Sequence, residues 1–124
     1  MNLPDEKVKF YGDVVARWLP KSSREMELVS PFSFIDKRGF KWFAPIGSIV
    51  DGASIPRLFW RFIGPPFVGK YRRASVIHDV YCKTKSMPHK QVHKMFYEAM
   101  LADGVSKIKA KQMYLAVKIG GPKW

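Results

Sequence analysis

The strongest constraint on the fold is a change in hydrophobic period at Tyr71. Before this residue, β-branched and aromatic side chains alternate in short runs separated by Pro and Gly, which is typical of strands. After it, apolar residues recur at the spacing of a helix. Strands first and helices afterwards predict an α+β fold, with a small antiparallel sheet from the N-terminal half packed against three C-terminal helices.

The chain of 124 residues is expected to form a single domain, residues 1–124, because globular domains commonly contain about 100–200 residues. We distinguish three segments within it: residues 1–50 are β-rich, residues 51–70 form an irregular loop with a short helix, and residues 71–124 are helical. Three strands are expected in the β-rich segment: residues 8–19, 26–35 and 40–44. Asp36 to Gly39 form a turn that joins the second and third strands in a hairpin.

Gly and Pro residues place the short helix between Arg57 and Ile63, and three longer helices after it. The first long helix contains His78, and the second ends at Asp103-Gly104, where glycine commonly terminates a helix. Ser106 is expected to cap the third helix, Lys107 to Ile119. The apolar stripe of this third helix consists of Ile108, Met113, Leu115, Ala116 and Ile119.

Charge is distributed unevenly along the chain. Residues 1–56 contain eight basic and seven acidic side chains, whereas residues 57–124 contain fourteen and three. A cationic half attracts polyanions, namely nucleic acid, an anionic membrane or an acidic protein, although a solvated face is the simpler alternative. The candidate contacts to an anionic partner are Lys70, Arg72, Arg73, Lys107, Lys109 and Lys111. Sequence-specific recognition of nucleic acid is not predicted, because no helix-turn-helix, zinc-finger or aromatic RNA-binding signature accompanies these residues.

Cys82 is the only cysteine, which excludes a disulfide within the chain and fits a reducing compartment. The first residues have neither the basic n-region nor the apolar h-region of a signal peptide. No run approaches the roughly 18 apolar residues of a membrane span. We therefore expect a protein that is made in the cytoplasm.

His78 and Asp79 are the most informative pair of residues for chemistry. Adjacent residues of a helix point about 100° apart, so the two side chains can serve different partners. An imidazole suits a general base or a neutral metal ligand, and a carboxylate suits an oxygen ligand. We predict catalytic roles for both. The structural alternative is a hydrogen-bonded core histidine, with Asp79 in an ion pair with Arg72, Lys83 or another nearby cation.

The first two long helices also have the spacing of a metal site. His78 and Cys82 are four residues apart on one helix, and His89 and His93 on the next. If these helices pack antiparallel, the four nitrogen and sulfur donors can converge, and zinc is the metal that they favour. The alternative for His89 is a solvated position at the helix start, whereas His93 shares a face with Phe96 and is expected to point inward.

The segment from Asp51 to Pro56 combines a carboxylate, a glycine and the hydroxyl of Ser54 just before the expected short helix. Ser54 can be considered as a nucleophile, although it lacks the sequence context of a nucleophile elbow. The competing interpretation is a turn whose Asp or Ser caps the helix that begins at Arg57.

Six short motifs follow one another along the chain: Pro31-Phe-Ser-Phe-Ile, Trp42-x-Ala44-Pro45, Asp51-Gly-Ala-Ser-Ile-Pro-Arg57-x-Phe59-Trp60, Ile63-Gly64, Ala74-Ser-Val-x-His78-Asp79 and Phe96-x-x-Ala99-Met100. Together they resemble a small phage and prophage family that is known only as a domain of unknown function. The resemblance covers nearly the whole chain. It implies a phage-derived gene and supplies no established reaction.

The resemblance also draws attention to His93. The family usually has an Asp three residues before the Phe that matches Phe96, and this chain has His93 there. A metal-competent residue is thus kept at an inward-facing position, and the change from oxygen to nitrogen favours zinc over calcium. The candidate metal ligands are Asp51, Asp79 and His93.

The pair of helices is similar to the secreted and parvoviral phospholipases A2. In that group a His-Asp pair on one helix supplies a general base and a calcium ligand, and an acidic residue on the antiparallel helix orients the histidine. The similarity implies that His78 activates water, that Asp79 holds calcium and that His93 lies near the position of the orienting acid. A neutral His can accept a hydrogen bond there but lacks the charge of a carboxylate. The glycine-rich calcium loop and the disulfides of that group are absent.

Three functions follow as hypotheses. The first is a phage-encoded accessory or virion-associated binding protein, acting in the host cytoplasm or in the virion on a phage structural or host protein. In it Asp51, His78, Asp79 and His93 converge on one polar site. The alternative is a hydrolase that uses zinc or calcium and acts on phospholipid or another anionic cell-envelope substrate, with His78 as base and Asp79 as ligand. The third is non-specific binding of nucleic acid through the lysines.

Overall fold

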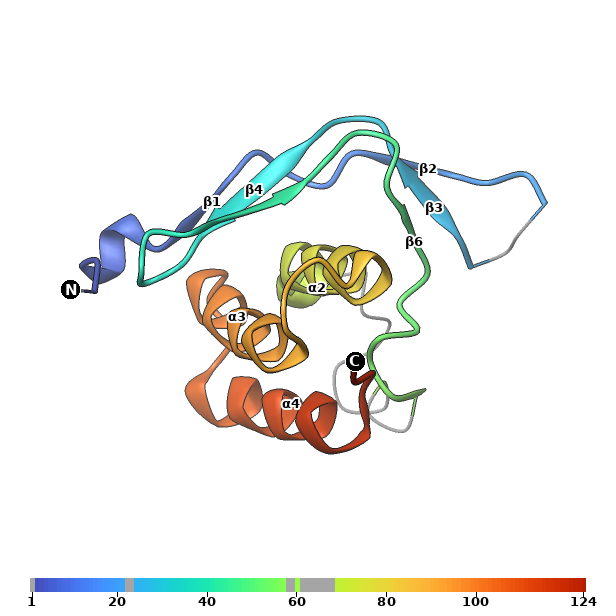
Figure 1. Ribbon diagram of the computed structural model, residues 1–124. Coiled ribbons are helices and arrows are strands. Elements are labelled where there is room, and N and C mark those ends of the chain that lie inside the picture. Colours follow the sequence, from blue (N-terminus) through green and yellow to red (C-terminus); the bar gives the residue numbers. More distant parts are fainter. Residues whose placement is uncertain (1, 22–23, 58–59, 61–68) are drawn as a thin grey trace.

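A computed structural model of the chain describes residues 2–21, 24–57, 60 and 69–124 (Figure 1). Within these ranges the fold is α+β, as predicted, with six short strands in two small antiparallel sheets followed by three helices. The expected short helix between Arg57 and Ile63 falls mostly outside the described residues. None of the described helices has both the length and the apolar character needed to cross a membrane.

Each sheet contains three antiparallel strands. The first sheet has the order β1 (Lys9–Tyr11), β4 (Phe32–Ile35) and β5 (Lys41–Ala44). The second has the order β2 (Ala16–Trp18), β3 (Met26–Leu28) and β6 (Ile49–Val50). Short 3-10 turns precede β1 and the first helix: η1 (Asp5–Lys7) and η3 (Gly69–Tyr71). The chain passes from one sheet to the other after β1, β3 and β5, so the two sheets together form one bent meander.

The expected strands at residues 8–19 and 26–35 are each interrupted by a bend. Gly12 has a φ of 87°, and a Cβ added there would lie 3.1 Å from the Cβ of Phe32, so only glycine fits this position without strain. In the second segment Pro31 has no amide hydrogen and cannot continue a ladder. The prediction of single long strands was wrong for this reason, because each is divided between the two sheets. The alternation of side chains also did not predict β6, which has only two residues.

The predicted hairpin is confirmed, and Asp36 fixes its turn. β4 pairs with β5, and Phe34 lies opposite Trp42. Asp36 Oδ1 accepts hydrogen bonds from the backbone amides of Arg38 at 2.9 Å and Phe40 at 3.0 Å. Its Oδ2 accepts a hydrogen bond from Trp42 Nε1 at 2.9 Å. Because Asp36 is buried, these donors replace the hydrogen bonds to water that the carboxylate loses on folding.

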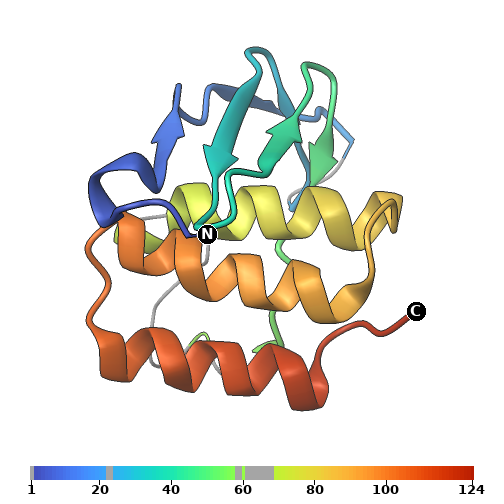
Figure 2. The same ribbon diagram turned by 60° about the vertical axis from the view of Figure 1, so that its left-hand side comes forward.

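The three predicted helices are confirmed: α2 (Arg72–Thr84), α3 (His89–Ala102) and α4 (Lys107–Gly120). Gly104 has a φ of 87° and follows the end of α3, as expected for a helix terminated by glycine. Ser106 caps α4, since its Oγ accepts a hydrogen bond from the backbone amide of Lys109 at 3.3 Å. The helices lie side by side, with α2 against the sheets, α3 next to α2, and α4 on the far side of α3 (Figure 2).

The core lies where the sheets meet α2 and α3, and α4 contributes only one narrow face to the protein interior. Its buried residues are Ala110, Met113, Ala116 and Val117. Ile108 and Ile119, which were expected in the apolar stripe, are 74% and 75% exposed, and Leu115 is 42% exposed. The predicted stripe was wrong for these three residues because α4 packs mainly against α3 and turns its opposite face to solvent.

Candidate active site

Three buried polar side chains form a row of hydrogen bonds in the core. Ser54 Oγ lies 3.1 Å from His78 Nδ1, and His78 Nε2 lies 2.9 Å from His93 Nδ1. His93 Nε2 extends the row to the carbonyl oxygen of Pro122 at 2.9 Å. Ser54, His78 and His93 are 3%, 0% and 1% exposed. The row therefore joins the loop after β6 to α2, α3 and the segment that follows α4.

The carbonyl of Pro122 determines where each proton of this row lies. A carbonyl oxygen only accepts hydrogen bonds, so His93 Nε2 carries a proton and donates it. A neutral His93 then has its lone pair on Nδ1, and His78 Nε2–H donates to it. The lone pair of a neutral His78 is thereby left on Nδ1, which accepts a hydrogen bond from the Ser54 hydroxyl. A hydroxyl that donates to an oriented imidazole is the arrangement by which serine nucleophiles are activated.

Burial keeps the two imidazoles neutral. Loss of hydration lowers the pKa of His78 well below its ordinary value of 6.5, and the neighbouring His93 lowers it further. Burial also lowers the pKa of His93, although the hydrogen bond to the carbonyl of Pro122 acts in the opposite direction. Neutral rings are what the proton positions along the row require. At neutral pH Nδ1 of His78 therefore carries no proton and can accept the hydrogen bond of the Ser54 hydroxyl.

The imidazole of His78 is held on three sides. Its ring stacks on Phe96 of α3, with ring centroids 4.5 Å apart and an angle of 30° between the planes. The hydrogen bonds to Ser54 and His93 fix the rotation of the ring within its plane. The result is a base whose Nδ1 faces the loop after β6 and whose Nε2 faces α3.

Asp79 holds the backbone of the loop that contains Ser54. Its Oδ2 accepts a hydrogen bond from the backbone amide of Asp51 at 3.0 Å, and its Oδ1 accepts one from the backbone amide of Ser54 at 3.3 Å. Burial raises the pKa of Asp79, while the hydrogen bonds act in the opposite direction. The loop thus turns N–H groups toward the carboxylate, whereas a calcium site needs oxygen ligands around the ion. This geometry fits a clamp on the loop and does not fit calcium ligation by Asp79.

Asp51 has partners of its own. Its Oδ1 accepts a hydrogen bond from the backbone amide of Ala53 at 2.9 Å, and its Oδ2 lies 3.2 Å from Lys83 Nζ. Burial alone would raise the pKa of Asp51, but the amide and Lys83 lower it overall. Lys83 therefore pairs with Asp51 and not with Asp79. Among the described residues, the predicted ligands Asp51, Asp79 and His93 do not form one cluster.

The nitrogen and sulfur donors of α2 and α3 do lie together. Cys82 Sγ is 3.6 Å from His78 Nε2 and 3.8 Å from His78 Nδ1. With His93, these residues form a buried group whose donor atoms lie within 4.8 Å of one another. His89, the fourth expected ligand, contacts Trp124 instead, with its Nδ1 at 2.8 Å from the carbonyl oxygen and 3.3 Å from the nitrogen of that residue. The structure thus brings together three of the four residues that were expected to bind zinc.

A small cavity borders the loop that contains Ser54. Its volume is about 140 Å³, and it is lined by Arg24, Asp51, Ala53, Ile55, Pro56, Arg57 and Trp60. The guanidinium of Arg57 lies 5.1 Å from the ring centroid of Trp60. Ser54 does not line the cavity, but Ala53 and Ile55 on either side of it do. The cavity therefore borders the backbone on both sides of Ser54, while the Ser54 hydroxyl is turned to His78.

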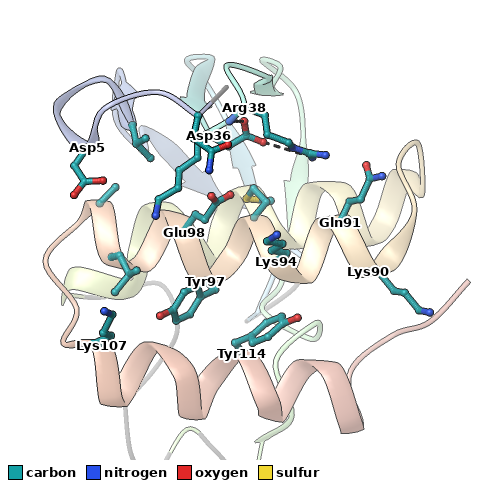
Figure 3. Close-up of a pocket in the computed structure, with 16 residues that line it drawn as sticks. Asp5, Asp36, Arg38, Lys90, Gln91, Lys94, Tyr97, Glu98, Lys107 and Tyr114 are labelled. Carbon is teal, nitrogen blue, oxygen red and sulfur yellow. Dashed lines mark hydrogen bonds and ion pairs between the residues drawn. The ribbon is translucent and has the colours of Figure 1, made fainter.

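A larger hollow lies elsewhere, between the N-terminal segment, the β4–β5 turn, α3 and α4 (Figure 3). Its volume is about 880 Å³ and its lining carries both signs of charge, including Lys94 and Glu98. Burial raises the pKa of Glu98. Lys107, one of the predicted anion contacts, also lines it. Neither His78 nor Ser54 lines this hollow, so the hollow is separate from the hydrogen-bonded row although it is the larger of the two spaces.

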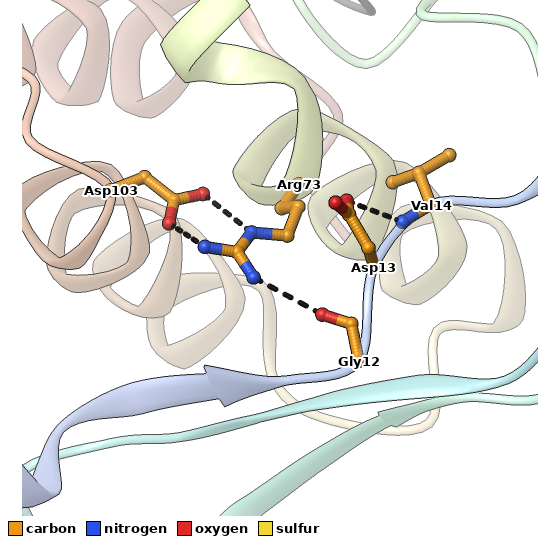
Figure 4. Close-up of polar contacts among 5 residues, drawn as sticks. All are labelled: Gly12, Asp13, Val14, Arg73 and Asp103. Carbon is orange, nitrogen blue, oxygen red and sulfur yellow. Dashed lines mark hydrogen bonds and ion pairs between the residues drawn. The ribbon is translucent and has the colours of Figure 1, made fainter.

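Arg73 is held within the protein (Figure 4). Its Nε and Nη2 donate to the two carboxylate oxygens of Asp103, the first at 3.1 Å, and its Nη1 donates to the carbonyl oxygen of Gly12 at 3.1 Å. The guanidinium also lies over the ring of Phe10, 4.7 Å from its centroid. These contacts tie α2 to the end of α3 and to β1, and they do not fit the predicted role of Arg73 as an anion contact. The other predicted anion contacts are exposed: Lys70, Arg72, Lys107, Lys109 and Lys111.

Comparison with known proteins places the chain in a family. A family model described as a protein of unknown function, DUF1353, matches residues 26–117. The chain belongs to the DUF1353 family. Two curated relatives come from Sinorhizobium fredii (strain NBRC 101917 / NGR234). The uncharacterized protein y4jT is 55% identical over 98 residues, which are 79% of this chain and 29% of that protein. The uncharacterized protein y4iH is 40% identical over 106 residues, which are 86% of this chain and 44% of that protein.

The chain therefore spans less than half the length of either of these relatives. No solved structure matches it. The region of the chain that matches the DUF1353 model contains Ser54, His78 and His93, and it ends before Pro122. The hydrogen-bonded row thus lies within the family region except for the carbonyl at its end.

Sequence reasoning treated Ser54 and His78 separately and missed their contact. They are 24 residues apart, and no periodicity relates a loop residue to a helix that lies beyond an irregular segment. The contact of His93 with the carbonyl of Pro122 could not be predicted from the sequence, because every residue has a carbonyl group. The signal that was present is the hydroxyl of Ser54 itself, since a serine between two apolar residues is a candidate for burial and a buried hydroxyl needs a hydrogen-bond partner.

Proposed function

We propose that this protein is a hydrolase of carboxylic esters, with Ser54 as its nucleophile and His78 as its general base. The observation that carries the proposal is the contact at 3.1 Å between the Ser54 hydroxyl and Nδ1 of a buried, neutral His78. His93 is a positioning residue, because it contacts the base and not the reacting atoms. The similarity of the helix pair to phospholipases A2 supports the role of His78 as a base that is oriented from position 93, although it implies water as the nucleophile in place of Ser54.

The proposed reaction has two proton transfers in each half. Ser54 Oγ attacks the acyl carbon while its proton moves to His78 Nδ1, and His78 Nε2–H remains hydrogen-bonded to His93. The Nδ1 proton then passes to the departing alcohol, which leaves an acyl group on Ser54. Water attacks this acyl group and gives a proton to His78, which returns it to Ser54 Oγ as the carboxylic acid departs. A local movement that exposes Ser54 Oγ while it stays in contact with His78 is included in the proposal, because Ser54 is only 3% exposed.

We infer that the substrate class is an anionic phospholipid or another anionic ester of the cell envelope. Residues 57–124 carry fourteen basic side chains against three acidic ones, which would attract the protein to an anionic surface. Lys107, Lys109 and Lys111 lie exposed on the outermost helix. The small cavity beside Ser54 also has two arginines in its lining, Arg24 and Arg57.

The proposal is tested by hydrolysis of a p-nitrophenyl ester and of phosphatidylglycerol vesicles, together with fluorophosphonate labelling and mass spectrometry of the labelled peptide. Ser54→Ala and His78→Ala are each expected to reduce turnover by about 10²–10⁴-fold, which is the usual contribution of such groups. Label is expected on Ser54 in the wild type only. Ser48→Ala is the matched control, because the Ser48 hydroxyl donates to the carbonyl of Pro45 in an exposed turn of the same region.

Two outcomes separate the components of this proposal. If His78→Ala is inactive and Ser54→Ala retains wild-type turnover, water is the nucleophile and the covalent route is rejected. If His78→Ala, shown by circular dichroism to be folded, turns over as fast as the wild type, the hydrolase itself is rejected.

A phage-encoded accessory or virion-associated binding role is the second candidate, and it stays a prediction. The exposed lysines favour it, because they would contact an acidic surface of a phage structural or host protein without any reaction at Ser54. Retention of partner binding by Ser54→Ala and its loss on reversal of charge at Lys109 and Lys111 would distinguish this role from catalysis.

A further inference from the structure

The two buried histidines face each other through the nitrogens that metals commonly bind, and a thiol lies beside them. His78 Nε2 and His93 Nδ1 are 2.9 Å apart, and Cys82 Sγ is 3.6 Å from His78 Nε2. All three residues are buried, and their donor atoms lie within 4.8 Å of one another. A position surrounded by two imidazole nitrogens and one sulfur has the donors that zinc prefers over calcium or magnesium.

We propose that His78, Cys82 and His93 form a binding site for one Zn²⁺ ion, with His78 Nε2, His93 Nδ1 and Cys82 Sγ as ligands. The proposal goes beyond hydrolysis, because the site stands on the three donor atoms alone. A thiol and two imidazoles leave the fourth position of a tetrahedral ion to water or to a neighbouring hydroxyl.

Two of the three distances between the donor atoms can be compared with those of a tetrahedral zinc site, and the third, between Cys82 Sγ and the nitrogen of His93, is at most 4.8 Å. Bonds of about 2.0–2.1 Å to nitrogen and about 2.3 Å to sulfur place two nitrogens about 3.4 Å apart and a nitrogen and a sulfur about 3.6 Å apart. The sulfur of Cys82 is already at 3.6 Å from His78 Nε2. The two nitrogens, at 2.9 Å, need to separate by roughly half an ångström, which amounts to the exchange of one hydrogen bond for an ion.

The outer nitrogens of the two histidines already have the partners that a metal site requires. A ligating histidine almost always bonds its second ring nitrogen to a carbonyl, a carboxylate or water, and this contact fixes the orientation of the ring. His93 Nε2 donates to the carbonyl of Pro122 at 2.9 Å, and this contact is unchanged when Nδ1 binds zinc. His78 Nδ1 lies 3.1 Å from Ser54 Oγ, which accepts as readily as it donates.

The proton balance of binding is simple. Zinc takes the place of the proton on His78 Nε2, and that proton moves to Nδ1, so His78 stays neutral and now donates to Ser54 Oγ. Cys82 releases its thiol proton to solvent and binds as thiolate. The ion and the thiolate together carry one positive charge, which the carboxylate of Asp79 on the same helix opposes.

A consequence for catalysis follows, and this consequence alone rests on the proposed function. With zinc bound, His78 Nδ1 carries a proton and no longer accepts one from Ser54. Zinc is therefore expected to inhibit ester hydrolysis at one ion per chain. Binding and inhibition are measured separately. If the protein hydrolyses no ester, zinc binding can still be tested, and if it binds no zinc, ester hydrolysis can still be tested.

The experiment titrates the full chain, stripped with a chelator and kept reduced, with Co²⁺ and then with Zn²⁺. We expect one ion per chain, an absorption band from thiolate to cobalt that Zn²⁺ displaces, and visible bands of a tetrahedral ion. Cys82→Ser is expected to lose the thiolate band and to bind at least about tenfold more weakly, as ligand loss usually does. His93→Asn is expected to weaken binding to a similar extent. His89→Ala is the matched control, because His89 lies one turn from His93 and its Nδ1 is occupied by Trp124.

Three results would overturn the site. They are the absence of stoichiometric binding to the folded wild type, stoichiometric binding of Co²⁺ to the wild type without a thiolate band, and a loss of binding in His89→Ala equal to that in His93→Asn. Circular dichroism of each variant without metal establishes that it is folded.

Discussion

Acidification is expected to destabilise the protein through its two buried histidines. Well above pH 6.5 His78 is neutral in both the folded and the unfolded chain, so it contributes no dependence on pH. As the pH falls below that value, the unfolded chain takes up a proton that the folded protein does not accept, because burial lowers the pKa of His78 in the fold. The free energy of unfolding therefore decreases as the pH falls, and it continues to decrease until the folded pKa is reached.

The magnitude follows from the ordinary pKa of 6.5. Between about pH 7.5 and about pH 5.5, one histidine that stays neutral in the fold lowers the free energy of unfolding by about 1.4 kcal/mol. His93, whose pKa is also lowered by burial, adds up to the same amount. Asp79 acts in the opposite direction, because its raised pKa lets the folded protein take up a proton first. The contribution of each histidine is therefore measured as a difference between the wild type and a variant.

The assay is urea unfolding of the wild type, His78→Gln and His89→Gln at the two pH values. The wild type is expected to lose about 1.4 kcal/mol more than His78→Gln on acidification, whereas His89→Gln, which keeps both buried histidines, is expected to lose as much as the wild type. A wild type and a His78→Gln variant that lose the same free energy would show that His78 takes up protons in the folded state. The proton positions assigned to the row from Ser54 to Pro122 would then be wrong.

Four further substitutions, of which Asp51→Asn is a control, test the polar contacts of the fold by urea unfolding. Asp79→Asn is expected to cost about 1–3 kcal/mol, because an amide cannot accept both loop N–H groups, while Asp51→Asn, at a partly exposed ion pair, is expected to cost about 1 kcal/mol or less. Equal effects of the two would refute the clamp. Arg73→Lys is expected to lower the free energy of unfolding by about 1–3 kcal/mol, since the lysine cannot form the paired contact with Asp103. Its retention on heparin is expected to be unchanged. Weaker retention without loss of stability would restore Arg73 as an anion contact. Asp36→Asn is expected to cost about 1–3 kcal/mol, and a loss below about half a kcal/mol would show that the turn does not depend on the carboxylate.

The helical half was predictable because its signals are local. Gly104 terminates α3 and Ser106 caps α4, and both act within one helical turn of the residues that they affect. The orientation of α4 was not predictable in the same way. Ile108, Leu115 and Ile119 are as apolar as the residues that α4 buries, and only the position of α3 decides which face is covered.

The sheet was harder to predict because its bends depend on partners far along the chain. In the sequence Gly12 does not differ from any other glycine in a strand. Its role depends on Phe32, whose Cβ lies 3.1 Å from the position that a Cβ of residue 12 would occupy. β6 consists of two residues, and it exists because β3 provides a partner. Such pairing depends on tertiary contacts, which an alternation of side chains does not report.

The candidate site was predictable in its residue types and less so in its partners. The adjacent helical positions of His78 and Asp79 predicted that their side chains point in different directions. The helical spacing of His93 and Phe96 predicted that His93 points inward. Which groups these side chains meet depends on the path of the loop after β6. Asp79 binds backbone amides, which have no counterpart in sequence, and Asp51 pairs with Lys83, which is one of several cations within reach.

One carbonyl group sets the polarity of the whole row, and it belongs to Pro122, outside every regular element of the fold. Rotation of that single peptide plane would release the outer nitrogen of His93, and either tautomer of the ring would then be equally acceptable. In one tautomer Nδ1 of His93 donates a hydrogen bond to His78 of α2, and in the other it accepts one. A small displacement of the chain beyond α4 would thus be transmitted, as a reversal of proton order, through one histidine on each of two helices to Ser54.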